Sequence, residues 1–435
     1  MTHAPLVHDL AQALHTLPAH GALLVGFSGG MDSSVLLHAL AHVEQARARG
    51  LRAVHVDHRL HADSAAWAQH CAGFCAALRV PFASSAVQVA RDSGSGLEDA
   101  ARAARHEALA AALAPGEILV LAQHRDDQAE TILLKLLRGA GPEGLGGMRT
   151  MRHFAQGYLW RPLLALPRAE LARYAQTHAL RWIEDPSNRD VSLRRNFLRA
   201  EILPRLQQRW PDAPAALAHS ASWARNAADF IAQHAAQALA DLQGLDPATL
   251  DWRGWLDLPD AVRDPVLRLW LRQLGLDEPA HFHVREIERQ LRASAPDRNP
   301  CVRWHATQVR RYRDRLYALR TQATPPSDWD ADWNGEPLAL PGGGTLALEG
   351  GANRSGIALR VRYRRGGERM KPAGMRHTRD LRLLLQEAGV PPWQRARVPL
   401  IHDREQLLAA GDLFLTDAAQ ALCTRLAARI VWRMD

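Results

Sequence analysis

The chain has 435 residues and an apolar content of 47%, which allows two or three domains with a sizeable core. It contains no apolar run long enough to span a bilayer and no secretory signal at its start, so we expect a cytoplasmic protein without a membrane partner. The formal charge of +8 favours a polyanionic partner, and the four cysteines lack the spacing of a metal site or a disulfide framework.

An α/β domain is predicted for residues 1–213. Short apolar runs alternate there with alanine-rich segments of helical periodicity. Strands are expected at 22–27, 52–56, 79–82 and 117–122, and helices at 34–48, 64–77, 97–113 and 127–138. This alternation favours a doubly wound parallel sheet, which binds its ligands outside the carboxyl ends of the strands.

A glycine turn follows the first of these strands and leads into a helix. Its residues are Ser28, Gly29, Gly30, Met31, Asp32 and Ser33. Backbone N–H groups at a helix N-terminus bind phosphate, and the two glycines let an anion approach closely. Asp32 is suited to hold Mg²⁺ on the phosphates. The turn has neither a Walker A lysine nor the spacing of a dinucleotide loop, and an ordinary glycine turn is the alternative.

Two further motifs of this domain carry polar side chains suited to a nucleotide or an RNA. The second strand runs into His55, Asp57 and His58, at the edge of the sheet where the glycine turn is expected. Arg102 and Arg105 share one helix face, where two guanidinium groups can hold phosphate or an RNA backbone. An ordinary strand exit and a solvated helix face are the respective alternatives.

An acidic cluster begins where the strand 117–122 ends. It contains His124, Asp126, Asp127 and Glu130, at the start of a predicted helix. Carboxylates beside a histidine can hold Mg²⁺ or accept a proton from an attacking amine. Acids at a helix N-terminus also complement the helix dipole, so a capping role stays open.

Two more domains are predicted in the rest of the chain. Residues 214–325 are mostly helical, with an arginine-rich strand pair expected at 301–320. A polar linker is predicted at 323–337, and residues 338–435 combine short strands with one helix. The segment 351–400 holds twelve Arg and Lys against three Asp and Glu, which favours nucleic acid as the partner.

Taken in order, these motifs resemble the tRNA(Ile)-lysidine synthetase family, whose catalytic domain is an N-type ATP pyrophosphatase with an adenine nucleotide α-hydrolase-like fold. The matching segments are SGGMDS at 28–33, HVDHRL at 55–60, AARAAR at 100–105, HRDDQAET at 124–131, LLRGAGPEGLGGM at 136–148, RPLL at 161–164, and WIEDPSNRD with RRNFLR at 182–199. RRGGERMKPAG at 364–374 and LLLQEAGVPPWQRARVPLI at 383–401 resemble the small α+β tRNA-binding end domain of that family.

The resemblance implies a substrate and two chemical steps. ATP adenylates C2 of the wobble cytidine in a tRNA(Ile) with the anticodon CAU and releases pyrophosphate. The ε-amine of free L-lysine then attacks C2 and releases AMP. Nothing in the sequence decides whether the protein is a homodimer.

The resemblance also implies site residues. ATP contacts would lie along 28–33, with Mg²⁺ on Asp32 and Asp127. The catalytic residues would be Asp32, Arg102, His124, Asp126, Asp127 and Glu130. Contacts to tRNA or substrate would come from Arg105, Asn188, Arg195, Arg364, Arg365 and Arg369.

Two positions depart from the family pattern. Gln123 stands where the family has the first of two consecutive histidines, so the base role tied to that histidine does not carry over directly. His106 follows Arg105 where the family often has tyrosine, which removes a stacking ring.

Other functions fit parts of the sequence. A tRNA 2-thiolation enzyme would need reactive cysteines such as a C-x-x-C pair, which the chain lacks. An ATP-dependent amidotransferase or NAD synthetase would leave the basic C-terminal segment without a role. A non-catalytic RNA-binding protein would not need the intact Ser28, Asp32 and Ser33.

Overall fold

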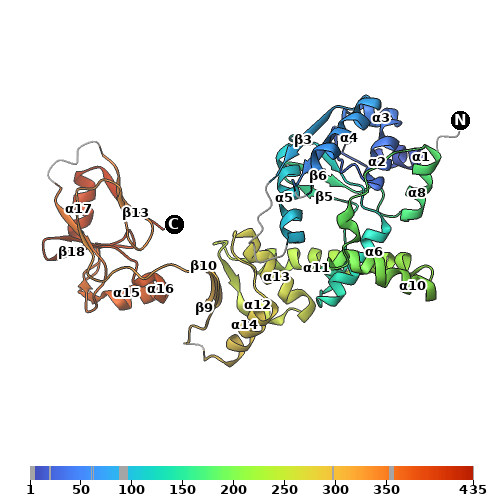
Figure 1. Cartoon of the computed structure of the whole chain (residues 1–435). Helices are drawn as coiled ribbons and strands as arrows, with labels where there is room; N and C mark the ends of the chain where they lie inside the picture. The colour runs from blue at the N-terminus through green and yellow to red at the C-terminus, as the bar shows by residue number, and fades with distance from the viewer. Residues whose placement is uncertain are drawn as a thin grey trace. The chain divides into compact units, whose positions relative to one another are not determined.

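The computed structural model describes residues 5–18, 21–59, 61, 63–87, 97–295, 298–351 and 357–434. Leu60 of the HVDHRL motif and Arg354 of the basic segment lie outside these residues. The chain forms two compact units, whose boundary between Ala232 and Gln233 falls inside the long helix α11 (Ala213–Leu242). Figure 1 shows the two units and labels many of their helices and strands.

The first unit is built on a six-stranded sheet with the order β3-β2-β1-β4-β6-β5. The strands are β1 (Leu23–Gly26), β2 (Leu51–Asp57), β3 (Phe82–Ala86), β4 (Ile118–Val120), β5 (Met151–Phe154) and β6 (Gly157–Trp160). All neighbouring pairs are parallel except β5 and β6, which form an antiparallel hairpin at the edge. The predicted doubly wound sheet is confirmed, with one antiparallel edge strand added.

Helices cover both faces of this sheet because its central strands are apolar on both sides. Val25 of β1 packs into the core shared with α1 (Pro5–Leu14), α2 (Met31–Ala41), α3 (Glu44–Ala48), α4 (Ser64–Ala77) and α8 (Arg168–Thr177). Its neighbour Leu24 points the other way and packs with Leu109 of α5 (Leu97–Ala112). The helix predicted at 34–48 is broken into α2 and α3, and the strand predicted at 79–82 begins only at Phe82, because Arg79 is in a turn with positive φ.

Short helices connect the sheet to α11. They are α6 (Arg125–Leu137), α7 (Pro142–Leu145), the 3₁₀ turn η1 (Pro186–Arg189), α9 (Arg194–Phe197), the π-helical turn η2 (Leu198–Ile202) and α10 (Leu203–Arg209). A π-helical turn shifts the register of the side chains that follow it and is frequently found at functional sites.

The second unit begins with helices packed on an antiparallel sheet of order β7-β10-β9-β8. These elements are β7 (Thr249–Asp251), α12 (Trp252–Asp257), α13 (Asp260–Gln273), α14 (His281–Ala293), β8 (Cys301–Trp304), β9 (Thr307–Tyr312) and β10 (Arg315–Arg320). The predicted strand pair at 301–320 is therefore a three-stranded meander.

The C-terminal part of this unit contains further small sheets around its own apolar core. Its elements are β11 (Asp330–Trp333), β12 (Leu338–Ala339), β13 (Thr345–Gly350), β14 (Leu359–Arg362), β15 (Arg369–Met370), β16 (Arg379–Asp380), α15 (Leu381–Glu387), α16 (Pro392–Arg395), β17 (Leu400–Asp403), β18 (Gln406–Ala410), β19 (Phe414–Leu415), α17 (Asp417–Arg425) and β20 (Ala428–Arg433). The linker predicted at 323–337 is wrong in part, because β11 pairs with β14 and buries Trp333 in the core. Of the described helices, none combines the length and the apolar character that crossing a membrane requires.

Candidate active site

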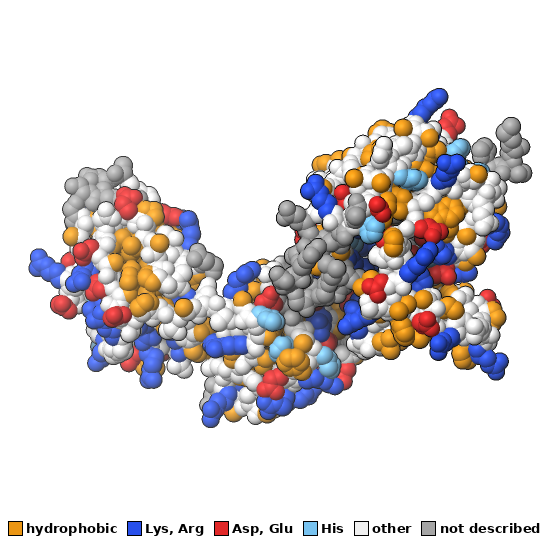
Figure 2. All heavy atoms as spheres, in the orientation of Figure 1, with side chains coloured by type: hydrophobic (Ala, Val, Ile, Leu, Met, Phe, Trp, Pro, Cys, Tyr) orange, Lys and Arg blue, Asp and Glu red, His pale blue; other side chains and the backbone are white. Residues whose placement is uncertain are grey.

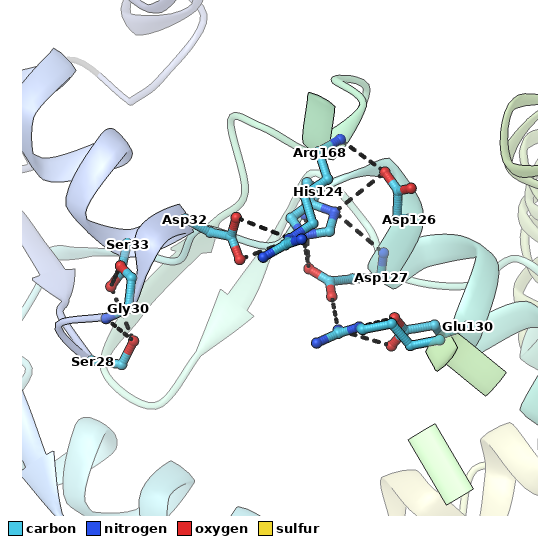
Figure 3. Close-up of polar contacts among 10 residues, drawn as sticks. Ser28, Gly30, Asp32, Ser33, His124, Asp126, Asp127, Glu130 and Arg168 are labelled. Atoms are coloured by element: carbon cyan, nitrogen blue, oxygen red, sulfur yellow. Dashed lines mark hydrogen bonds and ion pairs between the residues drawn. The ribbon is translucent and has the colours of Figure 1, made fainter. Parts of the chain in front are cut away.

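The glycine turn lies between the carboxyl end of β1 and the first turn of α2, as predicted. Gly29 has a φ of +81°, and Gly30 is the N-cap of α2. The hydroxyl of Ser33 donates to the carbonyl of Gly30 at 3.0 Å and lies 3.0 Å from the hydroxyl of Ser28 (Figure 3). The backbone N–H of Ile183 donates to the carbonyl of Gly29 at 2.9 Å. These hydrogen bonds fix the turn at the N-terminus of α2, where backbone N–H groups can bind an anion.

His124 joins this loop to the acidic cluster. Its side chain is 1% exposed and lies at the N-cap of α6. Nε2 lies 3.6 Å from Asp32 Oδ2 and 3.4 Å from Asp127 Oδ2, and Nδ1 lies 3.6 Å from Asp126 Oδ2 (Figure 3). The loop after β1 and the loop after β4 meet here because these two strands are parallel neighbours.

The three carboxylates keep this histidine charged. Burial lowers the pKa of His124, but Asp126, Asp32 and Asp127 outweigh it and raise the pKa to about 9. For Asp126, burial alone would raise the pKa. The hydrogen bonds from His124 and from the backbone N–H of Arg168 outweigh burial and lower the pKa of Asp126 to about 2. At neutral pH the site therefore contains a buried imidazolium among carboxylates.

Glu130 is fully buried on α6 and binds Arg199. The guanidinium of Arg199 donates to Glu130 Oε1 at 2.6 Å, to Glu130 Oε2 at 3.2 Å and to Asp127 Oδ1 at 2.9 Å. Asp127 also caps α6, because its Oδ2 accepts the backbone N–H of His124 at 3.0 Å. The capping role and the predicted site role thus fall on the same residue. Arg195 lies nearby and donates to the hydroxyl of Thr131 at 3.1 Å.

The arrangement fits a magnesium ion only together with phosphates. Among the described residues, no three His, Cys, Asp or Glu side chains form a ready-made metal site. However, Asp32 Oδ1 is buried and accepts no hydrogen bond from a described residue, although Arg168 Nε lies 3.7 Å away. Mg²⁺ on nucleotides is usually held by one or two carboxylates, phosphate oxygens and water. Asp32, beside the anion-binding loop, has the right chemistry for that role.

The predicted basic helix motif lies near the end of β2. Arg102 and Arg105 are exposed on α5, and burial followed by the charge of Arg105 lowers the pKa of His58. His55 is buried instead, with Nδ1 3.0 Å from the carbonyl of Phe27. The structure thus brings HVDHRL and AARAAR together, with His55 bonded to the strand that carries the loop.

The two remaining predicted contacts of the first unit differ in accessibility. Asn188 is exposed in η1, whose N-cap Asp185 accepts the backbone N–H of Ser187 at 2.8 Å. Asp-Pro-Ser-Asn is therefore a capped turn that presents Asn188. Met31 is partly buried and packs against the core of the first unit.

The predicted arginines of the C-terminal segment are not equivalent. Arg364 is only 15% exposed and lies 3.4 Å from Glu368. Arg365 is exposed and donates to the carbonyl of Ser327 at 3.2 Å, and Arg369 is exposed on β15. Figure 2 shows further Lys and Arg side chains (blue) on this part of the chain. Arg365 and Arg369 are better placed than Arg364 to meet a polyanion.

Two residues of the site were not predicted as such. Arg168 opens α8 and contacts both Asp32 and Asp126, yet a single arginine after Pro167 carries no distinguishing pattern. Arg199 belongs to the RRNFLR motif, and only its pairing with Glu130 separates it from its neighbours.

Comparison with known proteins covers almost the full length of the chain. Residues 4–206 match a PP-loop domain, 250–317 a TilS substrate binding domain and 359–432 a TilS substrate C-terminal domain. The tRNA(Ile)-lysidine synthase of Xanthomonas campestris is 48% identical over 435 residues, which cover 98% of each chain. This chain belongs to the tRNA(Ile)-lysidine synthase family.

Other members of the tRNA(Ile)-lysidine synthase family show the same extent of similarity. The Xylella fastidiosa enzyme is 47% identical over 90% of this chain and 91% of its own. The Pseudomonas aeruginosa enzyme is 43% identical over 95% of this chain and 94% of its own.

Among solved structures, the U34-tRNA thiolase NcsA of Methanococcus maripaludis is similar to this chain with a TM-score of 0.42 and 16% sequence identity. The matched region covers 51% of this chain and 78% of that of NcsA.

Proposed function

We propose that the protein is an ATP-dependent ligase that converts the wobble cytidine of tRNA(Ile) with the anticodon CAU into lysidine. The observation that carries this proposal is the junction of the PP-loop and the acidic cluster through His124, in a chain that matches its relatives over almost its whole length. In the first step the C2 oxygen of cytidine attacks the α-phosphate and pyrophosphate leaves. In the second step the ε-amine of L-lysine attacks C2 and AMP leaves.

We assign the binding of ATP to residues 28–33, with the backbone N–H groups and the hydroxyls of Ser28 and Ser33 facing the phosphates. Mg²⁺, when bound, neutralises phosphate charge, with Asp32 as its first protein ligand. Asp127, which now binds Arg199, would be the second ligand. His124 holds the carboxylates of Asp32, Asp126 and Asp127 together and orients them.

The attacking amine needs a cation site and a proton acceptor. We assign Asp126, whose pKa His124 helps to hold at about 2, to binding the lysine ammonium as a counter-ion. Asp127 takes up the proton that the ammonium must lose before its nitrogen attacks C2. Glu130 acts through Arg199 and keeps it beside Asp127. Arg102 serves the phosphates, whereas Arg105, Asn188, Arg195, Arg365 and Arg369 serve the tRNA. Arg364, which the sequence also predicted as a tRNA contact, is largely buried against Glu368 and contributes less to binding.

The chain organisation supports this division of work. We propose a catalytic domain at 1–213, a helical substrate domain at 214–325 and a tRNA-binding domain at 338–435. Each of the three matched family segments falls inside one of these ranges. We expect the protein in the cytoplasm, and sedimentation of the pure protein decides between a monomer and a homodimer.

The decisive experiment is incubation with ATP, radiolabelled lysine and transcripts of tRNA(Ile) with the anticodon CAU or of tRNA(Met). The expected result is lysine label in the tRNA(Ile) transcript alone, with one pyrophosphate released for each lysine. Sulfur transfer without lysine incorporation would support a 2-thiolation enzyme instead. Binding of tRNA without pyrophosphate release would support a non-catalytic RNA-binding protein.

A further inference from the structure

Arg161, the first residue after β6, is a buried cation at the carboxyl edge of the sheet. It is 5% exposed. Its Nε donates to Gln123 Oε1 at 2.8 Å, and its Nη1 donates to the carbonyl of Arg149 at 2.9 Å. Both acceptors are neutral, and no ion pair recorded between described residues includes this guanidinium. A buried charge without a countercharge is costly unless a ligand supplies one.

Two further arginines belong to elements that pack beside β6. Arg152 lies on β5 and pairs with Leu159 of β6. The guanidinium of Arg152 lies 5.3 Å from the ring centroid of Phe154. That ring contacts His106 of α5 at 5.8 Å, which connects the pair to the helix of Arg102. Burial, then Arg152 and Arg102, lower the pKa of Arg161 to about 10, so it remains charged at neutral pH. The strand pairing and the ring contacts therefore put Arg152 and the helix that carries Arg102 on the face of the sheet from which Arg161 follows.

We propose that Arg161, with Arg102 and Arg152 beside it, forms a phosphate-binding site at the carboxyl edge of the sheet, and that Gln123 is a positioning residue that orients Arg161. Bidentate guanidinium groups suit a phosphate oxygen pair, and a group of three suits its multiple charge. The phosphate belongs either to ATP or to the tRNA backbone. These two candidates follow from the proposed function, on which this inference rests. The amide oxygen of Gln123 accepts the hydrogen bond from Arg161, and unlike a histidine side chain the amide does not titrate near neutral pH.

The test compares Gln123→Glu, Arg161→Gln and the control Gln176→Glu, which adds the same charge on the exposed face of α8. Glutamate at 123 gives Arg161 a permanent anionic partner that competes with phosphate and leaves the fold intact. The affinities for ATP and for the tRNA(Ile) transcript are measured separately by calorimetry and filter binding, and the KM for lysine is measured by label incorporation.

The expected result is that Gln123→Glu and Arg161→Gln weaken the binding of either ATP or tRNA by about tenfold to a hundredfold, while Gln123→Glu keeps its melting temperature. The ligand whose binding weakens identifies the source of the phosphate. The proposal is overturned if both affinities stay at the wild-type value, if Gln176→Glu lowers them equally, or if only the KM for lysine rises. If Arg161→Gln does not fold, Gln123→Glu alone decides.

The two binding assays do not depend on lysine transfer. Wild-type protein that binds ATP and tRNA but incorporates no lysine would contradict the proposed function and leave the phosphate site standing. Wild-type lysine transfer with unchanged affinities in Gln123→Glu would contradict the phosphate site alone.

Discussion

Nε2 of His124 lies 3.6 Å from Oδ2 of Asp32, so a single buried imidazole spans the gap between the anion-binding loop and helix α6. The same ring lies within 3.6 Å of Asp126 and Asp127. Its charge is therefore a structural part of the site, and several measurable properties depend on it.

The stability of the metal-free protein should fall at alkaline pH. The pKa of His124 is about 9 in the folded state, above its usual value near 6.5, so its contribution is complete below about pH 6.5 and disappears as the pH rises through 9. The contribution is about 3 kcal/mol. Melting temperatures measured in EDTA between pH 6.5 and 9.5 should decrease, with a weaker pH dependence in His124→Gln. Parallel curves for the two proteins would refute this role.

Removing Arg199 should destabilise the protein through Glu130. Arg199→Met leaves the fully buried carboxylate of Glu130 without its partner and should lower the free energy of unfolding by about 3 kcal/mol. This value is near the lower limit for a buried ion pair because Arg199 is 40% exposed. Replacing Glu130 by leucine in the same chain should restore most of the loss. Urea unfolding of the two single variants and the double variant measures the coupling, and additive effects would show that the pair does not interact.

Gly29→Ala should abolish ATP binding. The residue has a φ of +81°, and an added Cβ would lie 2.5 Å from Ile183 Cδ1 and 2.9 Å from Cys71 Sγ. The loop must then change its backbone path. The matched control is Gly73→Ala on the exposed face of α4, where a Cβ meets nothing within 4 Å. That variant should bind ATP normally and be more stable by up to about 1 kcal/mol. Normal ATP affinity in Gly29→Ala would contradict the assigned loop geometry.

Cys71 and Cys75 should resist alkylation in the folded protein. Both side chains are fully buried on α4, and burial raises the pKa of each thiol to about 12. Iodoacetamide at pH 8 should therefore label the partly exposed Cys301 and Cys423 first. Mass spectrometry with and without urea provides the test. Early modification of Cys71 would mean that the core beneath the loop opens readily.

The basic C-terminal segment should show a division between its arginines. Arg365→Gln combined with Arg369→Gln should weaken tRNA binding and reduce the dependence of log K on log salt by about one unit for each lost phosphate contact. Arg364→Gln should lower stability more than binding, because it removes the partner of Glu368. Arg425→Gln, on the exposed side of α17, is the control. An unchanged salt dependence would make this surface an ordinary solvated face.

The meeting of the glycine loop and the acidic cluster was predicted from the sequence through the motifs shared with the family. The family resemblance placed Asp32 and Asp127 in one site, and the strand order explains why: residues just after β1 and β4 lie close together because those strands are parallel neighbours. Periodicity located β1, β2 and β4 and the helices α4, α5 and α6, but it gave no sign of the hairpin formed by β5 and β6 or of the helix α8.

Contacts that depend on side-chain packing could not be predicted. Glu130 and Arg199 are 69 residues apart, and nothing in either segment indicates that they pair. Strand β11 was missed because its sequence is acidic, and its acids are stabilised by Arg360 on the neighbouring strand, with Asp330 at 3.1 Å. Local propensity carries no information about such a partner.

The neutralised carboxylates also determine what an incoming cation gains. Asp32, Asp126 and Asp127 are already compensated by an imidazolium and by Arg168 and Arg199. A magnesium ion or a lysine ammonium must therefore displace one of these cations from a carboxylate. Its affinity reflects only how much better the carboxylate binds the incoming cation than the imidazolium or guanidinium that it replaces. Phosphate bound at the loop adds negative charge to the site and therefore favours binding of the incoming cation. Nucleotide and cation binding should thus be thermodynamically linked, each raising the affinity for the other.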